Sequence, residues 1–545
     1  MQAPTRAPGQ ARPQGARSAN PAPTGVSPFV RPASGLVRDV TAWQVFGFNV
    51  MNANIGIGLV WLTLLGPALY PGANLYLAVL LAFAGILPLN LLYVRLAAAF
   101  PRSGGDYVSI SRTLHPALGF AVNVAAMAYF CLFVGLGGLY TVQYGLTPLA
   151  RVAAAYSGSA AARHLADRLS TPTGTFLVSL AVLVAYALLM IRGGRLYFRA
   201  QSVAFVLGTA ALAAVVVAGL LLSRGAALHH VDGALARLHA GPVAALAGGR
   251  APAFSWSATL HAAIWPWIVF VGCYFSVFIA GEVRRPARTQ AIGVLGSLTW
   301  TLGWLLVVVF ALDHLFGQTL FSNLAFTPPA KLGLGSTPAF AELVALALHH
   351  EALAVLLLAA FTVWGFAWVG PTAMCVSRCL FAWSLDGLTP RWCAEVHRRW
   401  HTPYRALLLT FAAAGIFTAL MIYAHLSLLS GMIVMFTEWL CVAAVAIGLP
   451  AVAERRAFVL PPARRVLGLS TLSWLGVLTV PPVLVAAWLN LTDANSGTSV
   501  AHQPKALLLW LGILAGCFVV YGVVAALRGR RGTSLRLAVR LLPPD

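Results

Sequence analysis

Long apolar runs dominate this sequence and constrain its fold more than any other feature. Twelve of them have about the 20 residues that an α-helix needs to cross a bilayer. They lie near residues 42–67, 74–98, 117–148, 172–191, 197–223, 257–281, 289–312, 351–383, 404–424, 428–450, 467–489 and 506–527. Only 9% of the 545 residues are charged, against about 25% in a soluble domain. The sequence therefore predicts an all-α polytopic membrane protein with twelve transmembrane helices.

The basic residues are distributed unevenly across this predicted topology. The formal net charge is +22, and 28 of the 36 Lys and Arg lie in the tails and in the loops on one side of the membrane. The other eight are Arg151, Arg163, Arg168, Arg224, Arg237, Arg250, Lys331 and Lys505. Loops rich in Lys and Arg stay in the cytoplasm. We therefore expect a multi-pass protein of the cell membrane with both termini in the cytoplasm, and no nucleic-acid partner.

The first apolar run is poorly suited to a continuous membrane helix. Residues 47–61 contain three Asn and end in a Gly56-Ile57-Gly58 sequence, and each Gly weakens a helix by about 1 kcal/mol relative to Ala. An interrupted helix would expose two helix ends at membrane depth, where the N-terminal end attracts anionic groups and the C-terminal end cationic ones. Close packing of helices through small residues is the alternative interpretation.

A second interrupted run favours the interpretation as a binding site. The sixth run contains Pro266, which removes a helix hydrogen bond, and Gly272 lies six residues further on. Runs one and six are the first members of two sets of five, and interrupted segments at matching positions mark the midplane site of inverted-repeat transporters. Runs three and eight are also both unusually long. The sequence therefore predicts a five-plus-five inverted repeat.

Three loops on the basic side carry distinctive sequences. After run two comes FPRSGGDYV at 100–108, followed by SRTLHPALGF at 111–120. After run six comes AGEVRRPAR at 280–288, and after run eight comes RCLFAWSLDGLTP at 378–390. In this order and at these loops, the chain closely resembles prokaryotic permeases of the amino acid–polyamine–organocation (APC) superfamily over about residues 41–450.

The resemblance implies a leucine-transporter-like fold with broken helices 1 and 6, moving an amino acid or related amine by alternating access. In such a permease, backbone N–H groups of the first broken helix receive the substrate carboxylate and carbonyls of the sixth receive its amino group. The residues that match these two turns are Ile55, Gly56, Ile57, Gly58, Phe270, Val271, Gly272 and Cys273. Tyr129, Phe130 and Trp364 are candidates for the walls of the site, with ordinary aromatic packing as the alternative.

The sequence departs from the superfamily pattern at two positions. Tyr274 stands where members often have an acidic residue, and Gly208 stands where proton-coupled members have a Lys. Glu438 is the clearest acidic residue inside a core span, so we predict that it supplies any proton coupling; a permanently neutral, structural Glu438 is the alternative. With Tyr274 in place of an acid, a neutral amino acid is the expected substrate.

These expectations divide the chain into four parts. Residues 1–40 form a disordered cytoplasmic tail, 41–460 the inverted-repeat core of helices 1–10, 461–527 helices 11 and 12, and 528–545 a basic cytoplasmic tail. The leading function is secondary active transport of amino acids, as an exchanger or a proton symporter. A transporter-like sensor or scaffold and a polyamine or organic-cation permease are the alternatives. Paired carboxylates and HEXXH-type motifs are missing at membrane depth, so we expect neither an enzyme nor a metal or cofactor.

Overall fold

The twelve predicted membrane spans are confirmed in the computed structural model, which describes residues 38–248, 252–456, 464–495, 499–530 and 535. In chain order, the spans are α1–α3 (Ala42–Leu69), α4 (Leu75–Ala99), α6–α7 (Pro116–Ser157), α9 (Pro172–Ile191), α10 (Gly194–Leu221), α12–α13 with a 3₁₀ segment (Trp256–Phe278), α14 (Pro286–Leu315), α17–α18 (Glu351–Leu385), α19 (Tyr404–Tyr423), α20 with a preceding 3₁₀ turn (Leu428–Ala453), α21 (Thr471–Thr492) and α22 (Pro504–Gly529). The third and eighth spans have 42 and 35 residues and are the longest, as predicted.

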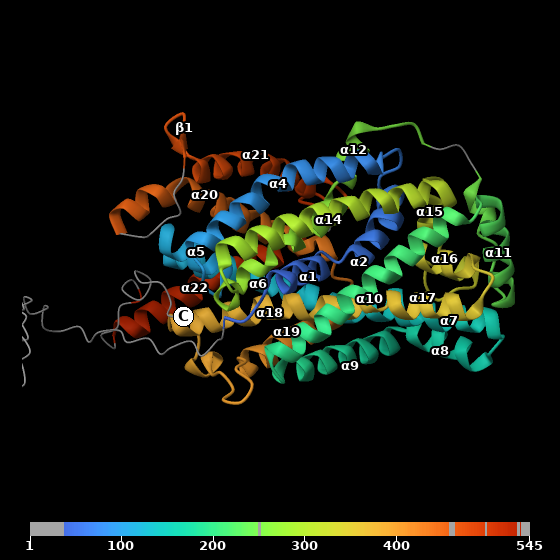
Figure 1. The fold of residues 1–545 in the computed structure, drawn as a ribbon, viewed down its shortest axis with the longest axis horizontal. Helices are drawn as coiled ribbons and strands as arrows, with labels where there is room; N and C mark the ends of the chain where they lie inside the picture. Colours follow the sequence, from blue (N-terminus) through green and yellow to red (C-terminus); the bar gives the residue numbers. More distant parts are fainter. Residues whose placement is uncertain (1–37, 249–251, 457–463, 496–498, 531–534, 536–545) are drawn as a thin grey trace, which may run out of the picture.

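Shorter elements connect the spans. The connecting helices are α5 (Gly105–Thr113), α8 (Ala160–Ser170), α11 (Arg224–Arg237), α15 (Gln318–Phe326) and α16 (Phe340–Ala347), and strands β1 (Arg465–Val466) and β2 (Leu469–Ser470) form one small hairpin. The spans run along the long axis of the molecule, with α5 at one end and α8, α11 and α16 at the other (Figure 1). We call these the terminal end, where the described chain begins and finishes, and the distal end.

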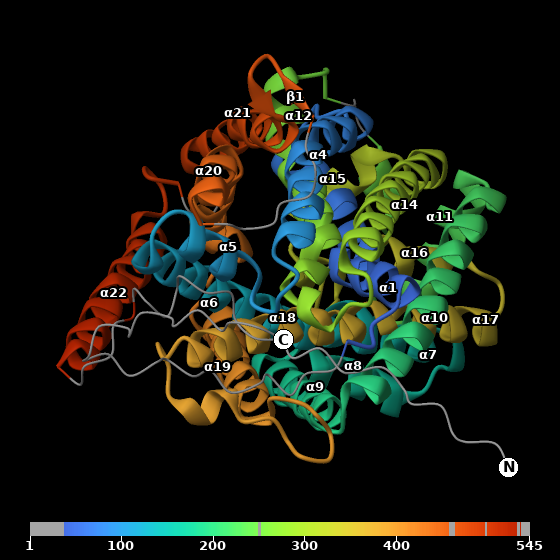
Figure 2. The same cartoon turned by 60° about the vertical axis from the view of Figure 1, so that its left-hand side comes forward.

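The first span lies at the centre of the bundle and the last at its edge. In their most apolar windows, 94% of the first span is buried but only 11% of α22, and α22 lies at the margin of the bundle in Figure 2. Central position explains how the first span tolerates three Asn, because each of them binds another span. The bonds run from Ser276 N to Asn49 Oδ1 (2.9 Å), from Thr372 Oγ1 to Asn52 Oδ1 (2.7 Å) and from Asn54 Nδ2 to the Trp364 carbonyl (3.2 Å).

The helical run of the first span is interrupted at Asn54. α1 (Ala42–Ala53) ends there, Asn54 takes a left-handed conformation (φ 51°, ψ 65°), and α2 (Ile55–Val60) begins directly after it. The predicted turn at residues 55–58 is thus helical, and the interruption lies one residue earlier. Asn tolerates left-handed backbone better than most residues, and its Oδ1 accepts a hydrogen bond from Ile57 N (3.2 Å), which caps α2.

The sixth span changes its helical type at the predicted glycine. α12 (Trp256–Ala262) and α13 (Ile264–Val271) are followed by the 3₁₀ segments η4 (Gly272–Phe278) and η5 (Ala280–Glu282). A Cβ on Gly272 would lie 2.3 Å from the backbone N of Ala53, so only glycine allows this approach. The two interrupted segments therefore meet, at Asn52–Ala53 and Gly272.

The three distinctive loops converge at the terminal end. Ser103 pairs with Ile279 in an antiparallel bridge, and Gly104 N donates to the Phe278 carbonyl (3.0 Å). Two buried ion pairs join the same loops, Arg378 to Glu282 and Arg112 to Asp386 (2.6 Å each). Together these contacts close the bundle at this end.

The predicted tails lie mostly outside the described residues. Of the tail 1–40, residues 1–37 are outside them, whereas Val40 pairs with Val283 in a parallel bridge. Of the tail 528–545, only 528–530 and 535 are described, and α22 continues to Gly529.

Candidate functional site

A small cavity lies where the two interrupted segments meet. Its volume is about 20 Å³, which is room for about one water molecule. The lining residues are Asn52, Ala53 and Trp61 from the first span, Tyr129, Phe130 and Phe133 from α6, Ile268, Val271, Gly272 and Phe275 from the sixth span, Trp368 and Thr372 from α18, and Met432, Met435 and Trp439 from α20. The cavity is therefore built from spans one, three, six, eight and ten.

Asn52 provides a hydrogen-bond donor at this cavity. Its side chain is 4% exposed, and Oδ1 accepts from Thr372 Oγ1 at 2.7 Å. Within the described part of the chain, Nδ2 has no hydrogen-bond partner. A buried donor without a partner costs about 1–3 kcal/mol, and a carboxylate placed in the cavity would satisfy it. None of the described residues that line the cavity is acidic or basic.

The predicted carboxylate turn is covered by Trp364. A Cβ on Gly56 would lie 2.3 Å from Trp364 Cγ, and the indole Nε1 donates to the Gly208 carbonyl (2.9 Å). Gly58 is packed against Val269, whose Cγ2 would lie 2.4 Å from an added Cβ. Trp364 therefore lies over the start of α2 and bridges it to α10, instead of lining the cavity.

The other residues of the predicted site fall into two groups. Tyr129, Val271 and Gly272 line the cavity, and the Tyr129 hydroxyl donates to the Leu428 carbonyl at 2.8 Å. The other four are buried in the surrounding core: Ile55, Ile57, Phe270 and Cys273. Phe270 packs against Phe83 with ring centroids 5.7 Å apart, and Cys273 Sγ lies 3.6 Å from Thr301 Oγ1.

Tyr274 and Glu438 lie one layer behind the cavity. The Tyr274 ring stacks on that of Tyr93, with centroids 3.9 Å apart, and its hydroxyl accepts from Trp439 Nε1 (2.7 Å). Glu438 is fully buried, and its Oε1 accepts from Asn123 Nδ2 (2.9 Å). Trp439 lines the cavity. Tyr274 therefore contacts a residue of the cavity wall, and Glu438 is next to that residue in the chain.

Comparison with known proteins decides the family. The sequence model of the amino acid permease family matches residues 41–514, which includes both interrupted spans and every residue that lines the cavity. The chain belongs to the amino acid permease family. This confirms the resemblance to the APC superfamily and makes the protein a membrane-embedded transporter of amino acids or related organic cations.

The permease builds much of its cavity wall from residues that sequence reasoning missed. Met432, Met435 and Trp439 recur at helical spacing on α20 and form one face. That spacing marks an inward-facing side of a helix and was visible in the sequence. It does not distinguish a cavity wall from ordinary core packing. Asn52 was also visible, as a polar residue in an apolar run.

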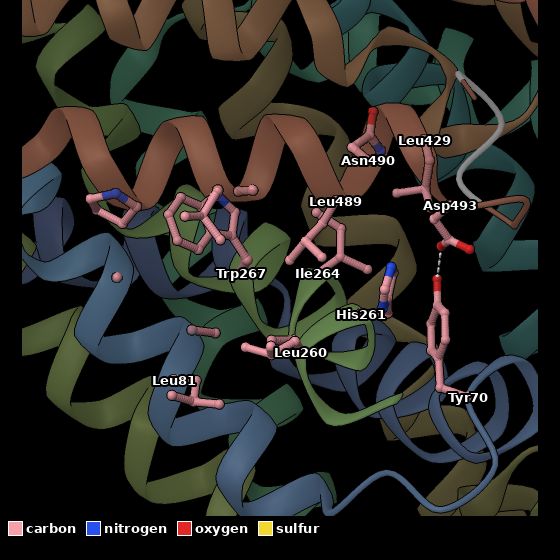
Figure 3. Close-up of a pocket in the computed structure, with 16 residues that line it drawn as sticks. Tyr70, Leu81, Leu260, His261, Ile264, Trp267, Leu429, Leu489, Asn490 and Asp493 are labelled. Carbon is pink, nitrogen blue, oxygen red and sulfur yellow. Dashed lines mark hydrogen bonds between the residues drawn. The ribbon is translucent and has the colours of Figure 1, made fainter. Parts of the chain in front are cut away.

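A second cavity of the permease lies near the distal end. Its volume is about 280 Å³, and it is lined mainly by α4, the sixth span and α21 (Figure 3). The Tyr70 hydroxyl donates to Asp493 Oδ2 (2.5 Å), and the His261 ring stacks on Tyr70 with centroids 5.8 Å apart. Burial and the Asp493 carboxylate raise the pKa of Tyr70, so its phenol remains a donor. Residues 52–54 and Gly272 do not line this larger cavity, so it is not the candidate site.

Proposed function

We propose that this permease is a secondary active transporter of neutral amino acids that works by alternating access, as an exchanger or a proton symporter. The observation that carries the proposal is the unpartnered Asn52 amide at the cavity where Asn52–Ala53 meets Gly272. An N–H donor next to a helix interruption is suited to a substrate carboxylate. Membership of the amino acid permease family supports the same substrate class.

The chemistry of the cavity wall favours a neutral substrate. Apart from the Asn52 amide, the hydroxyls of Tyr129 and Thr372 and the indole N–H groups of three tryptophans, its lining side chains are apolar. A second ammonium group, as in a dibasic amino acid or a polyamine, would need a buried anionic partner. Among the lining residues that the structure describes, there is no acidic side chain to serve as this partner.

The size of the cavity supports a closed state within a transport cycle. About 20 Å³ is too small for any amino acid, so spans one, six, eight and ten must separate before substrate enters. The loops that meet at the terminal end would have to part for release on that side. The excess of Lys and Arg at this end supports a cytoplasmic position and an orientation in the cell membrane with both termini inside.

A ligand panel tests the proposed substrate class. We expect at least one neutral amino acid to raise the melting temperature of the purified protein, because a ligand at 100 times its Kd stabilises by about 2.7 kcal/mol. Arginine and putrescine should have little effect. Stabilisation by putrescine or arginine alone would instead identify an organic-cation permease. Binding of a neutral amino acid without any uptake into liposomes would identify a sensor.

A further inference from the structure

Two buried carboxyl groups lie behind the central cavity, on the helices α5 and α20, which pack against each other. Asp106 is in the first turn of α5 and is 2% exposed, and Glu438 on α20 is fully buried. Asp106 Oδ2 accepts from the Tyr93 hydroxyl (2.8 Å) and Glu438 Oε1 from Asn123 Nδ2 (2.9 Å). Glu438 Oε2 is buried without a hydrogen-bond partner among the described residues. One carboxyl oxygen is thus left without a protein donor in the described part of the chain.

The arginines buried nearby are committed to other carboxylates. Arg112 pairs with Asp386 and Arg378 pairs with Glu282. The titratable groups that face the two carboxyls from the packed elements are Tyr93 on α4, Tyr274 on η4, Cys375 and Cys379 on α18, and Cys441 on α20. A phenol or a thiol is either neutral or negative, so none of these groups can balance a carboxylate.

Two uncompensated carboxylates cannot stay charged together in such a place. Burial disfavours each charge, and each carboxylate disfavours the other. Asp106 lies outside the membrane spans, and burial raises its pKa to about 7 although the hydrogen bond from Tyr93 lowers it. The form in which the two carboxyls hold one proton between them is therefore favoured over the form in which both are charged.

The position of the two carboxyls links the cavity to the closed terminal end. Glu438 is adjacent in the chain to Trp439, which lines the cavity and donates to Tyr274. Tyr274 stacks on Tyr93, which donates to Asp106. Asp106 follows Gly104 and Gly105, which pack against Ala382 and Phe278 where the loops close. Opening of this loop would admit water to the carboxyls.

We propose that Asp106 and Glu438 share one proton and together form the proton-binding site of this permease. The proposal rests on the proposed function as a transporter. While the terminal end is closed, the pair keeps its proton, because burial of both carboxyls disfavours the doubly charged form. When the loop around Asp106 opens, the proton leaves to water on that side. A proton taken up from the other side in the opposite state restores the pair, so one proton crosses per cycle.

Infrared titration of purified, monodisperse protein measures the shared proton without requiring transport. The variants are Asp106→Asn, Glu438→Gln and the double variant, and the exposed Glu395→Gln serves as the control. Wild type and the control should show a buried carboxylic C=O band that titrates near neutral pH. The double variant should lose it. In each single variant the band should titrate at lower pH, because the neighbouring negative charge is gone.

Tyr93→Phe provides a second test that keeps both carboxyls and the ring stack. Loss of the phenol donor should move the titration to higher pH, since that hydrogen bond favours the charged form of Asp106. A titration unchanged in the single variants and in Tyr93→Phe would overturn the shared proton, as would a band that persists in the double variant.

Liposome assays separate this proposal from the proposed function. Asp106→Asn and Glu438→Gln should abolish amino acid uptake driven by a pH gradient and retain exchange of internal for external substrate, with Glu395→Gln unchanged in both. Undiminished gradient-driven uptake in either variant would overturn the pair as the coupling site, and so would a wild type that exchanges substrate without responding to the gradient. Absence of exchange in wild type, with the infrared titration intact, would contradict the proposed function instead.

Discussion

Asn52 connects the first span to both the eighth span and the central cavity through a single carboxamide. A hydrogen bond to a charged group is worth about 1.5–3 kcal/mol, so we expect Asn52→Leu to weaken the binding of a neutral amino acid by about 10- to 100-fold. Thr372→Val is the matched control, because it removes the bond to Oδ1 and leaves the amide in place. Its effect should be much smaller. Equal losses in both variants, measured by calorimetry, would mean that the position acts through packing.

Gly56 is constrained by packing more than by substrate. Its added Cβ would lie 2.3 Å from Trp364 Cγ, and such overpacking costs about 1–3 kcal/mol. Gly56→Ala should therefore lower the melting temperature, even though Ala is the better helix former. Gly303→Ala on α14 is the control, because no atom of the described residues lies within 4 Å of its Cβ position. This variant should leave stability unchanged or raise it slightly. An unchanged melting temperature in Gly56→Ala would show that Trp364 does not hold this position.

Closure of the loops at the terminal end can be measured through the accessibility of a native cysteine, Cys379. Cys379 Sγ lies 3.6 Å from the Gly104 carbonyl, beneath the loop that closes this end, and the buried Glu282–Arg378 pair holds the neighbouring contacts. Breaking a buried pair by removing one partner costs about 3–5 kcal/mol. Glu282→Gln should therefore speed maleimide labelling of Cys379, followed by mass spectrometry, by about tenfold or more, since about 1.4 kcal/mol gives a factor of ten.

Glu395→Gln is the control for this measurement. Glu395 also pairs with an arginine, Arg405 (3.0 Å), but both side chains are largely exposed, and exposed pairs contribute about 0–1 kcal/mol. Labelling of Cys379 should therefore match wild type. Equal labelling in Glu282→Gln and wild type would contradict the assignment of the ion pair to closure.

At the scale of elements, the sequence was most informative about the membrane spans, because the length of an apolar run alone predicts where a span begins and ends. The fourth run, 172–191, coincides with α9, and the sixth, 257–281, differs from its span by one residue at the start and three at the end. The interruption of the first span was harder to place. Propensity points to Gly56 and Gly58, but the left-handed residue is Asn54, because its carboxamide both caps α2 and binds the Trp364 carbonyl. The cover that Trp364 forms over Gly56 depends on packing between distant segments.

For the whole molecule, the three distinctive loops were recognised separately in the sequence, and the structure shows that they meet at one end. Their convergence follows from the topology, which places every loop of the basic side together. A single sequence does not specify the tertiary contacts that decide which side chains pair across these loops. The pair of Glu282 with Arg378 is an example. Asp106 illustrates the limit, because its sequence context in GGDY does not indicate that it faces Glu438's span.

Counterflow in proteoliposomes tests the central claim most directly, namely that the junction of α1 and η4 is the substrate site of a transporter. Vesicles preloaded with an unlabelled neutral amino acid identified by the ligand panel should transiently accumulate the labelled form when they contain wild-type protein. At substrate concentrations near the wild-type Kd, Asn52→Leu should reduce the initial rate several-fold or more, and Thr372→Val should retain most of it. Wild-type counterflow that Asn52→Leu leaves unchanged, or no counterflow of any amino acid by folded wild-type protein, would contradict the account.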